Sequence, residues 1–396
     1  MRISVPNCLF IAALLFLSAC ATDNNISRRA AFVRADGAEL TASEIDSEVT
    51  RLMAAGHVPG LGLALIADGR VAYAKAYGMA DIEKARALQT DTIMYGASLT
   101  KAAFAYMVMT LVDDGIVGLD RPIFKMLPKP LPDYEGYTDL AGDLRWKKWT
   151  PRMLLSHTAG LPNWRFLEDD KKLKIIFEPG SRYAYSGEGI QVLQFALEKG
   201  LGLDVFQLMQ TRVFDRFAMT RSAMKWRDDF RPNFAQTYDE TGKSLGHNMR
   251  KSVRAAGSMD TTLSDFAAFL AGLQRGEGLS PAARSQMLKP QIASTAKHQF
   301  PSQTPVDTHD NESIALSYGL GWGIFNSTFG SAYFKEGHDD GTNNFALCLD
   351  RKRRCLLILS NSSNGEGIFL YLADALLGKT NLPWEWEGYA PYDKRN

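Results

Sequence analysis

Ser98 and Lys101 are spaced so that a hydroxyl and an amine could share one face of a helix. A strand-like run at 93–97 leads into Ser98, and an apolar-periodic segment at 102–114 follows it and stops at Gly115. Residues three apart on a helix are neighbours, so the amine would lie beside the hydroxyl. A lysine placed in this way can take the serine proton without any histidine. The spacing predicts a serine nucleophile at a helix N-terminus.

The tetrapeptide Ser-x-x-Lys alone is a weak signal, because it also occurs at 222–225 and 294–297. A helix N-cap serine followed by a surface lysine has the same pattern. The two further copies lack the preceding strand and the long following helix. We therefore interpret them as surface positions, and the context favours Ser98 as the reactive serine.

Five further stretches accompany this tetrapeptide. They are Leu-Leu-Ser-His-Thr-Ala-Gly-Leu-Pro at 154–162, Phe-Glu-Pro-Gly-Ser-Arg-Tyr-Ala-Tyr-Ser-Gly-Glu-Gly at 177–189, Ala-Ala-Gly-Ser-Met at 255–259, Tyr-Gly-Leu-Gly-Trp-Gly at 318–323 and Glu-Gly-His-Asp-Asp-Gly at 336–341. In this order and spacing the chain resembles the β-lactamase-related serine hydrolases. That group includes class C β-lactamases, penicillin-binding D,D-peptidases, D-aminopeptidases and related esterases. The resemblance covers 40–380, and the run at 154–162 is its most specific part.

The resemblance implies a role for each matching residue. Ser98 would accept the acyl group and Lys101 would be its proton partner. Tyr185 would be the second-motif tyrosine, which passes protons between nucleophile and leaving group as a phenol or phenolate. Tyr183 is the alternative, but the residues after Tyr185 lead directly into a predicted helix. His157 is expected to be structural and to tie its own turn by hydrogen bonds.

The third motif departs from the family pattern. It normally reads Lys-Thr-Gly in class C β-lactamases and often His-x-Gly in relatives, and its strand supplies a backbone N–H to the oxyanion hole. His338 is the candidate here, with Asp340 in the glycine position and Gly341 next, which a one-residue shift or bulge would accommodate. The alternative is a hairpin-turn histidine. Asp339 and Asp340 would disfavour an anionic substrate carboxylate.

The second motif departs as well. Gly187 stands two residues after Tyr185, where many family members carry an asparagine that helps to hold the substrate's amide. We expect Gly187 and Gly341 to line the substrate site. The resemblance implies an acyl-enzyme mechanism on an ester or amide carbonyl, without metal or organic cofactor, and these departures favour an esterase type.

Two alternatives stay open. One is a true β-lactamase, D,D-peptidase or D-aminopeptidase that acts on cell-wall-like substrates. The other is a catalytically silent penicillin-binding lipoprotein, which the joint presence of Ser98, Lys101 and Tyr185 argues against. The chain carries 45 Lys plus Arg against 44 Asp plus Glu, so a nucleic-acid partner is not expected. Its six histidines show no metal-ligand spacing.

The N-terminus resembles a bacterial lipoprotein signal. An apolar run at 9–17 is too short to span a bilayer, and it ends in Leu-Ser-Ala-Cys at Cys20. Cleavage after residue 19 would leave a lipid on Cys20 and a polar tether over 20–39; the alternative is a plain secretory signal. Ala21 would favour the outer membrane, so we expect an exported, periplasm-facing, lipid-anchored protein of a Gram-negative-type bacterium.

Both ends of the remaining chain predict strands and the middle predicts helices. The expected elements are a helix at 41–55, a hairpin of 61–67 and 71–77, helices at 190–199 and 263–273, an irregular loop at 280–312, strands at 318–325, 331–335, 343–350 and 354–359, and a helix at 368–377. The pattern predicts an α+β domain at 40–380, with an antiparallel sheet from both ends, packed helices and a largely helical insertion, followed by a tail at 381–396. This matches the transpeptidase-like fold that the resemblance implies. Cys348 and Cys355 would either form a hairpin disulfide or remain two half-buried thiols.

Overall fold

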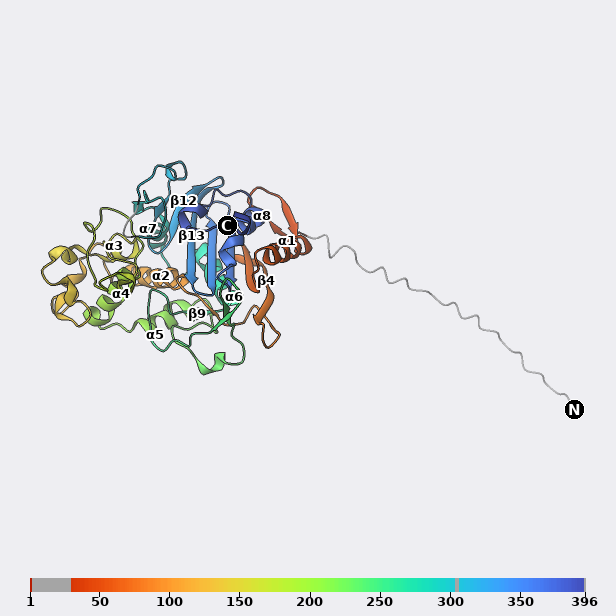
Figure 1. Cartoon of the computed structure of the whole chain (residues 1–396), viewed down its shortest axis with the longest axis horizontal. Helices are drawn as coiled ribbons and strands as arrows, with labels where there is room; N and C mark the ends of the chain where they lie inside the picture. Colours follow the sequence, from red (N-terminus) through yellow and green to blue (C-terminus); the bar gives the residue numbers. More distant parts are fainter. Residues whose placement is uncertain (2–29, 303–305, 395–396) are drawn as a thin grey trace.

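The computed structural model describes residue 1 and residues 30–302 and 306–394 (Figure 1). The predicted signal peptide, Cys20 and the first part of the predicted tether lie outside the described residues. Within the described ranges, no helix is both long and apolar enough to span a membrane.

A large antiparallel sheet forms the centre of the molecule (Figure 1). Among the described residues it has nine strands in the order β10-β11-β12-β13-β14-β15-β3-β4-β5. They are β3 (Gly60–Ala67), β4 (Arg70–Asp81), β5 (Arg86–Ala87), β10 (Ile292–Ala293), β11 (Ser317–Tyr318), β12 (Gly323–Ser327), β13 (Gly330–Asp339), β14 (Thr342–Leu349) and β15 (Arg354–Ser360). The C-terminal strand β15 pairs with the N-terminal strand β3, which confirms the predicted sheet from both ends of the chain.

Short strand pairs lie outside this sheet. They are β1 (Ala30–Val33) with β2 (Glu39–Thr41), β6 (Met94–Tyr95) with β9 (Asp260–Thr261), and β7 (Thr237–Tyr238) with β8 (Ser244–Gly246). Strand β1 falls within the predicted tether of 20–39, so the folded part of the chain begins before residue 40.

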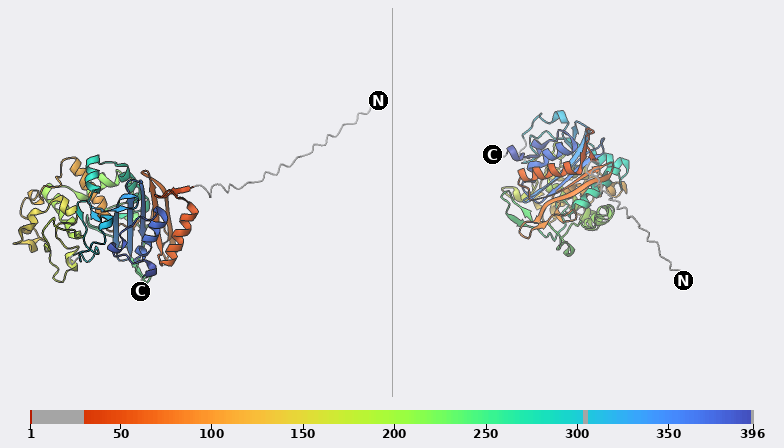
Figure 2. Two further views of the ribbon diagram at one scale, coloured as in Figure 1. Left: turned by 90° about the horizontal axis from the view of Figure 1, so that it is seen from above. Right: turned by 90° about the vertical axis from the view of Figure 1, so that its right-hand side faces the viewer.

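Helices cover both faces of the sheet. The helices are α1 (Ala42–Ala55), α2 (Leu99–Asp113), α3 (Pro151–Leu155), α4 (Gly187–Phe195), α5 (Val205–Met209), α6 (Leu263–Arg275), α7 (Pro281–Leu288), α8 (Phe369–Leu377) and α9 (Trp384–Glu387). Figure 2 shows α1 and α8 together over one face, where their apolar side chains share a core with β3 and β15. Helices α2 and α6 belong to the core on the opposite face.

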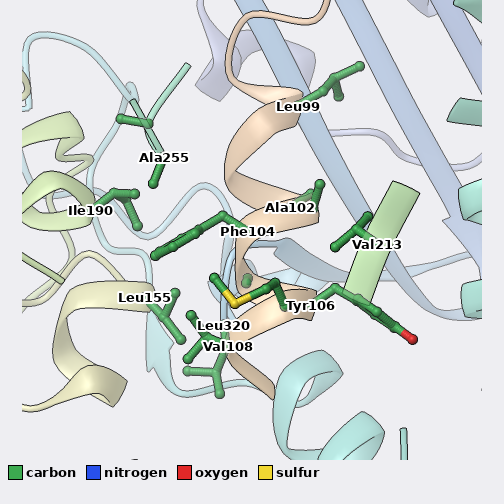
Figure 3. Close-up of a cluster of buried hydrophobic side chains, with 14 of the residues drawn as sticks. Leu99, Ala102, Phe104, Tyr106, Val108, Leu155, Ile190, Val213, Ala255 and Leu320 are labelled. Atoms are coloured by element: carbon green, nitrogen blue, oxygen red, sulfur yellow. The ribbon is translucent and has the colours of Figure 1, made fainter. Parts of the chain in front are cut away.

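Helix α2 is buried on all sides rather than along one stripe. Thirteen of its 15 residues are buried, whereas the sequence periodicity emphasised only a subset. In Figure 3, Phe104 points toward Leu155 and Ile190, and Ala102 and Val213 lie on the other side of the helix. A helix that is apolar all round must lie inside the protein. Because α2 is fixed in this way, the residues at its N-terminus have a fixed position.

Three segments differ from the sequence prediction. The expected loop at 280–312 contains α7, which starts with Ser280 as N-cap and Pro281. The expected strand at 318–325 is two short strands, β11 and β12, joined by a turn. The expected tail contains α9, whose Trp386 is 1% exposed and packs with its ring centroid 5.7 Å from that of Tyr183. The α9 segment is therefore part of the core.

Candidate active site

Ser98 lies at the junction between the short strand β6 and helix α2. The backbone N–H of Gly96 donates to Met259 O at 2.9 Å, which joins this junction to the strand β9 region. Ala97 has φ of 45°, a backbone conformation that costs free energy in a residue other than glycine. Thr100 Oγ1 donates to Ala97 O at 2.6 Å. These contacts hold Ser98 as the N-cap of α2, as the sequence predicted.

The Lys101 amine lies against the Ser98 hydroxyl. Lys101 Nζ donates to Ser98 Oγ at 2.8 Å and to Ala256 O at 2.6 Å. The side chain is buried, and this burial lowers the pKa of Lys101 well below the ordinary lysine value, with a smaller contribution from the positive charge of Lys335. The lowered pKa favours the neutral amine, which is the form that can accept the serine proton.

Tyr185 is the third predicted catalytic residue, and it lies two residues before the start of α4. Its ring centroid is 4.9 Å from Lys101 Nζ, which donates to Ser98 Oγ. Burial, followed by the nearby charge of Glu336, raises the pKa of Tyr185 well above the ordinary tyrosine value, so the side chain is a phenol rather than a phenolate at neutral pH. The alternative, Tyr183, instead donates to Gln299 Oε1 at 3.0 Å.

His157 holds the Tyr185 segment in place. Its carbonyl accepts from Ala184 N at 2.9 Å, and its Nδ1 accepts from Ser186 N at 3.2 Å. The imidazole ring packs 4.5 Å from the Tyr185 ring, centroid to centroid. Burial lowers the pKa of His157 well below the ordinary histidine value, which keeps the ring neutral. These contacts agree with the structural role expected for it.

Lys335 is a site residue that the sequence analysis missed. It is fully buried on β13, and its Nζ donates to Tyr185 Oη at 3.2 Å and to Glu336 O at 3.0 Å. Nζ also forms an ion pair with the Glu336 carboxylate. Lys335-Glu336-Gly337 is a strict Lys-x-Gly tripeptide, a match to the third motif that the sequence analysis overlooked.

Gly337 brings β13 up to the start of α2. A Cβ atom at this position would lie 2.7 Å from Gly96 O and 3.2 Å from Leu99 N, so only glycine fits without displacement of backbone. The pairing between β12 and β13 stops at Gly323 and Phe334. From Lys335 onward, β13 pairs only with β14 among the described strands, so its other edge has no strand partner. The strand edge from Lys335 onward is thus next to Ser98.

His338 faces away from Tyr185. Its Nδ1 lies 3.3 Å from Glu366 Oε2 and 3.0 Å from Asn343 Nδ2, and the hydrogen bond with Glu366 raises its pKa. The place beside Tyr185 belongs to Lys335, three residues earlier. His338 lines the Ser98 pocket, but its imidazole is directed toward Glu366, so its catalytic role stays a prediction.

The two glycines predicted to line the substrate site have different positions. Gly187 starts α4, and a Cβ atom there would lie 2.6 Å from the indole ring of Trp164, so this ring occupies the space that a side chain at residue 187 would need. Gly341 belongs to the turn between β13 and β14, with φ of 71°, and its N–H donates to Ser363 Oγ at 2.8 Å. Gly341 is a turn residue that does not line the Ser98 pocket.

A pocket of about 190 Å³ opens beside Ser98. Aromatic, arginine and strand-edge residues line it: Tyr95, Ser98, Trp164, Phe166, Asn248, Arg250, Arg254, Ala256, Gly257, His338 and Asp339. Among the described residues, no group of His, Cys, Asp and Glu side chains could hold a metal ion.

The other Ser-x-x-Lys copies lack this geometry. Ser222 is buried, and its hydroxyl donates to Asp265 Oδ2 at 2.8 Å, so its interpretation as a surface residue is wrong. Ser294 is buried as well, while Lys297 is exposed. Away from the pocket, Cys348 and Cys355 face each other across the β14–β15 hairpin and form the disulfide that the sequence left open.

Comparison with known proteins identifies related sequences. A family model described as Beta-lactamase matches residues 45–379. "Penicillin-binding protein 4*" of Bacillus subtilis is 24% identical over 338 residues, which cover 76% of this chain and 68% of that protein. "Protein flp" of Staphylococcus aureus is 22% identical over 335 residues; the match takes in 80% of this chain but spans only 62% of that protein. "Lovastatin esterase" of Penicillium rubens is 25% identical over 304 residues, or 64% of this chain and 76% of that protein.

Solved structures share the fold. The octameric penicillin-binding protein homologue from Pyrococcus abyssi superposes with a TM-score of 0.69 at 22% identity, covering 88% of this chain and 79% of that one. This likeness concerns the arrangement of the sheet and helices.

Proposed function

This chain belongs to the beta-lactamase family, and we propose that it is an esterase-type serine hydrolase that forms an acyl-enzyme on Ser98. The observation that carries the proposal is the 2.8 Å hydrogen bond between Lys101 Nζ and Ser98 Oγ, at a lysine whose burial lowers its pKa. A neutral amine at hydrogen-bond distance from a hydroxyl is the arrangement that activates a serine.

The proposed reaction has two halves. Ser98 Oγ attacks the carbonyl carbon while its proton moves to Lys101 Nζ, and the backbone N–H of Ser98 and one from the β13 edge stabilise the oxyanion. The tetrahedral intermediate then expels the leaving group, which takes a proton from the Tyr185 phenol. Tyr185 regains a proton from Lys101 or Lys335 through the hydrogen bonds around its hydroxyl. Water attacks the acyl-enzyme in the second half, releases the acid and returns the proton to Ser98.

The preference for esters rests on the second motif. The amide side chain that helps β-lactamases and D,D-peptidases to hold an amide substrate is missing at Gly187, and the Trp164 indole fills that space. An indole ring cannot accept a hydrogen bond from a substrate amide. The esterase among the relatives supports the same substrate class.

A β-lactamase or D,D-peptidase activity is the second candidate. The observation that favours it is Lys335-Glu336-Gly337, because Lys-x-Gly is the third-motif pattern of class C β-lactamases and Lys335 Nζ is 3.2 Å from Tyr185 Oη. In this candidate, Lys335 would also attract a substrate carboxylate.

A rate comparison on the purified chain decides between these candidates. The two substrates are a short-chain nitrophenyl ester and a chromogenic cephalosporin, each with wild type and with Ser98→Ala. We expect ester turnover that the substitution abolishes, and slow or absent cephalosporin turnover. Fast cephalosporin turnover would instead assign a β-lactamase. Covalent labelling of Ser98 without turnover of either substrate would support the silent penicillin-binding alternative, and ester turnover by Ser98→Ala would refute the mechanism.

A further inference from the structure

Two aromatic rings, one half-buried and one exposed, form an apolar surface in the lining of the Ser98 pocket. The rings of Trp164 and Phe166 are nearly parallel, with an interplanar angle of 16° and centroids 5.8 Å apart, and both line the pocket. We call this pair the aromatic platform. Phe166 is 59% exposed, although exposure of a phenylalanine ring to water is unfavourable. The platform therefore offers apolar area that a bound molecule could cover.

The backbone that carries the platform is fixed to the N-terminus of α4. Arg165, between the two rings, makes a two-pronged ion pair with Glu188, with Nε–Oε1 of 2.9 Å and Nη2–Oε2 of 2.8 Å. Its backbone N–H also donates to Glu188 Oε1 at 3.1 Å, and Glu188 N donates to Asn163 O at 3.0 Å. Because α4 follows Tyr185 directly, the platform has a fixed position relative to the reacting groups, and little ordering is needed on binding.

Gly187 lets the platform approach the reacting groups. A Cβ atom at Gly187 would fall between 2.6 and 2.8 Å from three indole atoms of Trp164, so the ring could not keep its position beside any larger residue. The indole ring centroid is 5.9 Å from Lys101 Nζ. A group that rests on Trp164 would consequently be part of a substrate whose carbonyl is at Ser98.

The rest of the pocket lining is largely polar. Arg250 stacks on Tyr95, with its Cζ 3.2 Å from the ring centroid, and Asn248, Arg254 and Asp339 lie nearby in the lining. An apolar substituent therefore finds its apolar contact area on the platform side.

We propose that the aromatic platform binds the acyl group of the substrate and that this group is an aromatic ring on a short chain, as in an arylalkanoyl ester. The inference rests on the proposed function and specifies its substrate class. The acyl side is assigned because the acyl group is the part of the substrate that stays bonded to Ser98. The Trp164 ring lies against Gly187 and 5.9 Å from Lys101 Nζ, the hydrogen-bond partner of Ser98. Ring stacking favours a flat aromatic group over a saturated ring of similar size.

Thioesters of a small aliphatic thiol test this inference, because their leaving group has no ring that could compete for the platform. Acetyl, 3-phenylpropionyl and 3-cyclohexylpropionyl thioesters are compared by the release of free thiol, with the full chain as wild type, Phe166→Ala and Leu167→Ala. Leu167 is the matched control, because it is 65% exposed, adjacent in sequence and absent from the pocket lining.

We expect the wild type to prefer phenylpropionyl over cyclohexylpropionyl in kcat/KM, and Phe166→Ala to reduce the phenylpropionyl-to-acetyl ratio about fivefold, mainly through KM. Leu167→Ala should leave that ratio unchanged. An unchanged ratio in Phe166→Ala, or an equal loss in Leu167→Ala, would overturn the inference while Ser98-dependent acetyl turnover keeps the proposed function. No turnover of any thioester, with Ser98-dependent turnover of the nitrophenyl ester retained, would overturn the inference alone, whereas no turnover of either kind of substrate would refute both.

Discussion

Lys101 and Tyr185 show how one buried site assigns opposite protonation states to two ordinary side chains. Burial disfavours the charged form of each, so it lowers the pKa of Lys101 and raises the pKa of Tyr185. The lysine can then accept a proton and the tyrosine can donate one. Both properties follow from the fully enclosed environment at the N-terminus of α2.

The pH dependence of the reaction reports the state of Lys101. Since the charged lysine cannot accept the serine proton, kcat/KM for a neutral ester should rise with pH and level off at the lowered pKa of Lys101, well before the ordinary lysine value of 10.5. Tyr185 should cause no loss of activity below its own ordinary value of 10.0, because its pKa is raised. A steady-state pH–rate profile measures this. A rise that continues to the ordinary lysine value would contradict the assignment.

Two single substitutions compare the contributions of Lys335 and His338 to catalysis. Lys335→Gln removes the cation that donates to Tyr185, so we expect kcat/KM for an ester to fall by about 100-fold or more. His338→Gln changes a side chain that faces Glu366, and its effect should stay within about threefold. Ester kinetics of both variants, with circular dichroism as a control for folding, measure this. The reverse order of effects would favour the catalytic assignment of His338 over that of Lys335.

At the scale of elements, local signals were the predictable part. Helix α1 begins at Thr41 with a capping box to Glu44, α6 begins at Thr262, and the β3–β4 hairpin turns at Asp68 and Gly69, so each boundary is encoded by neighbouring residues. The position of Lys335 beside Tyr185 depends instead on strand register between segments 150 residues apart. The tripeptide Lys335-Glu336-Gly337 was the one local signal that the motif lies three residues before His338.

The Cys348–Cys355 disulfide joins β14 and β15 close to the turn between these two strands. Closing a loop with a sequence separation of 7 limits the unfolded chain, so the double variant Cys348→Ser/Cys355→Ser should lose about 2–3 kcal/mol of unfolding free energy. Denaturant titration measures this loss, and mass spectrometry after alkylation with and without reductant checks the bridge itself. Two thiols that alkylate in the native, unreduced protein would exclude the disulfide.

At the scale of the whole molecule, both ends of the chain contribute to one fold. Strands β3 and β15 pair across the sheet, and the last described segment places Trp386 against Tyr183, close to the Tyr185 segment (Figure 1). This segment lies beyond the family match at 45–379, which explains why no motif predicted its packing. Burial of such a tryptophan depends on long-range contacts that sequence periodicity does not reveal.

We further propose that the N-terminal segment delivers this fold to a membrane surface through a lipid on Cys20. Cys20→Ser, expressed in a bacterial host with the lipoprotein pathway, should move the protein from the membrane fraction to the soluble fraction and abolish fatty-acid labelling, because the acceptor thiol is removed. Cell fractionation with radiolabelled palmitate measures both. Unchanged membrane association and labelling in the variant would contradict the proposal.

The acyl-enzyme on Ser98 is the central claim, and its direct detection is the decisive measurement. The purified chain is mixed with a nitrophenyl ester, quenched in acid within the first turnover and analysed by intact-protein and peptide mass spectrometry. We expect a mass increase of one acyl group on the peptide that contains Ser98, and its absence in Ser98→Ala. Turnover of the ester with no acyl group on Ser98, or with the group on another residue, would contradict the proposed mechanism.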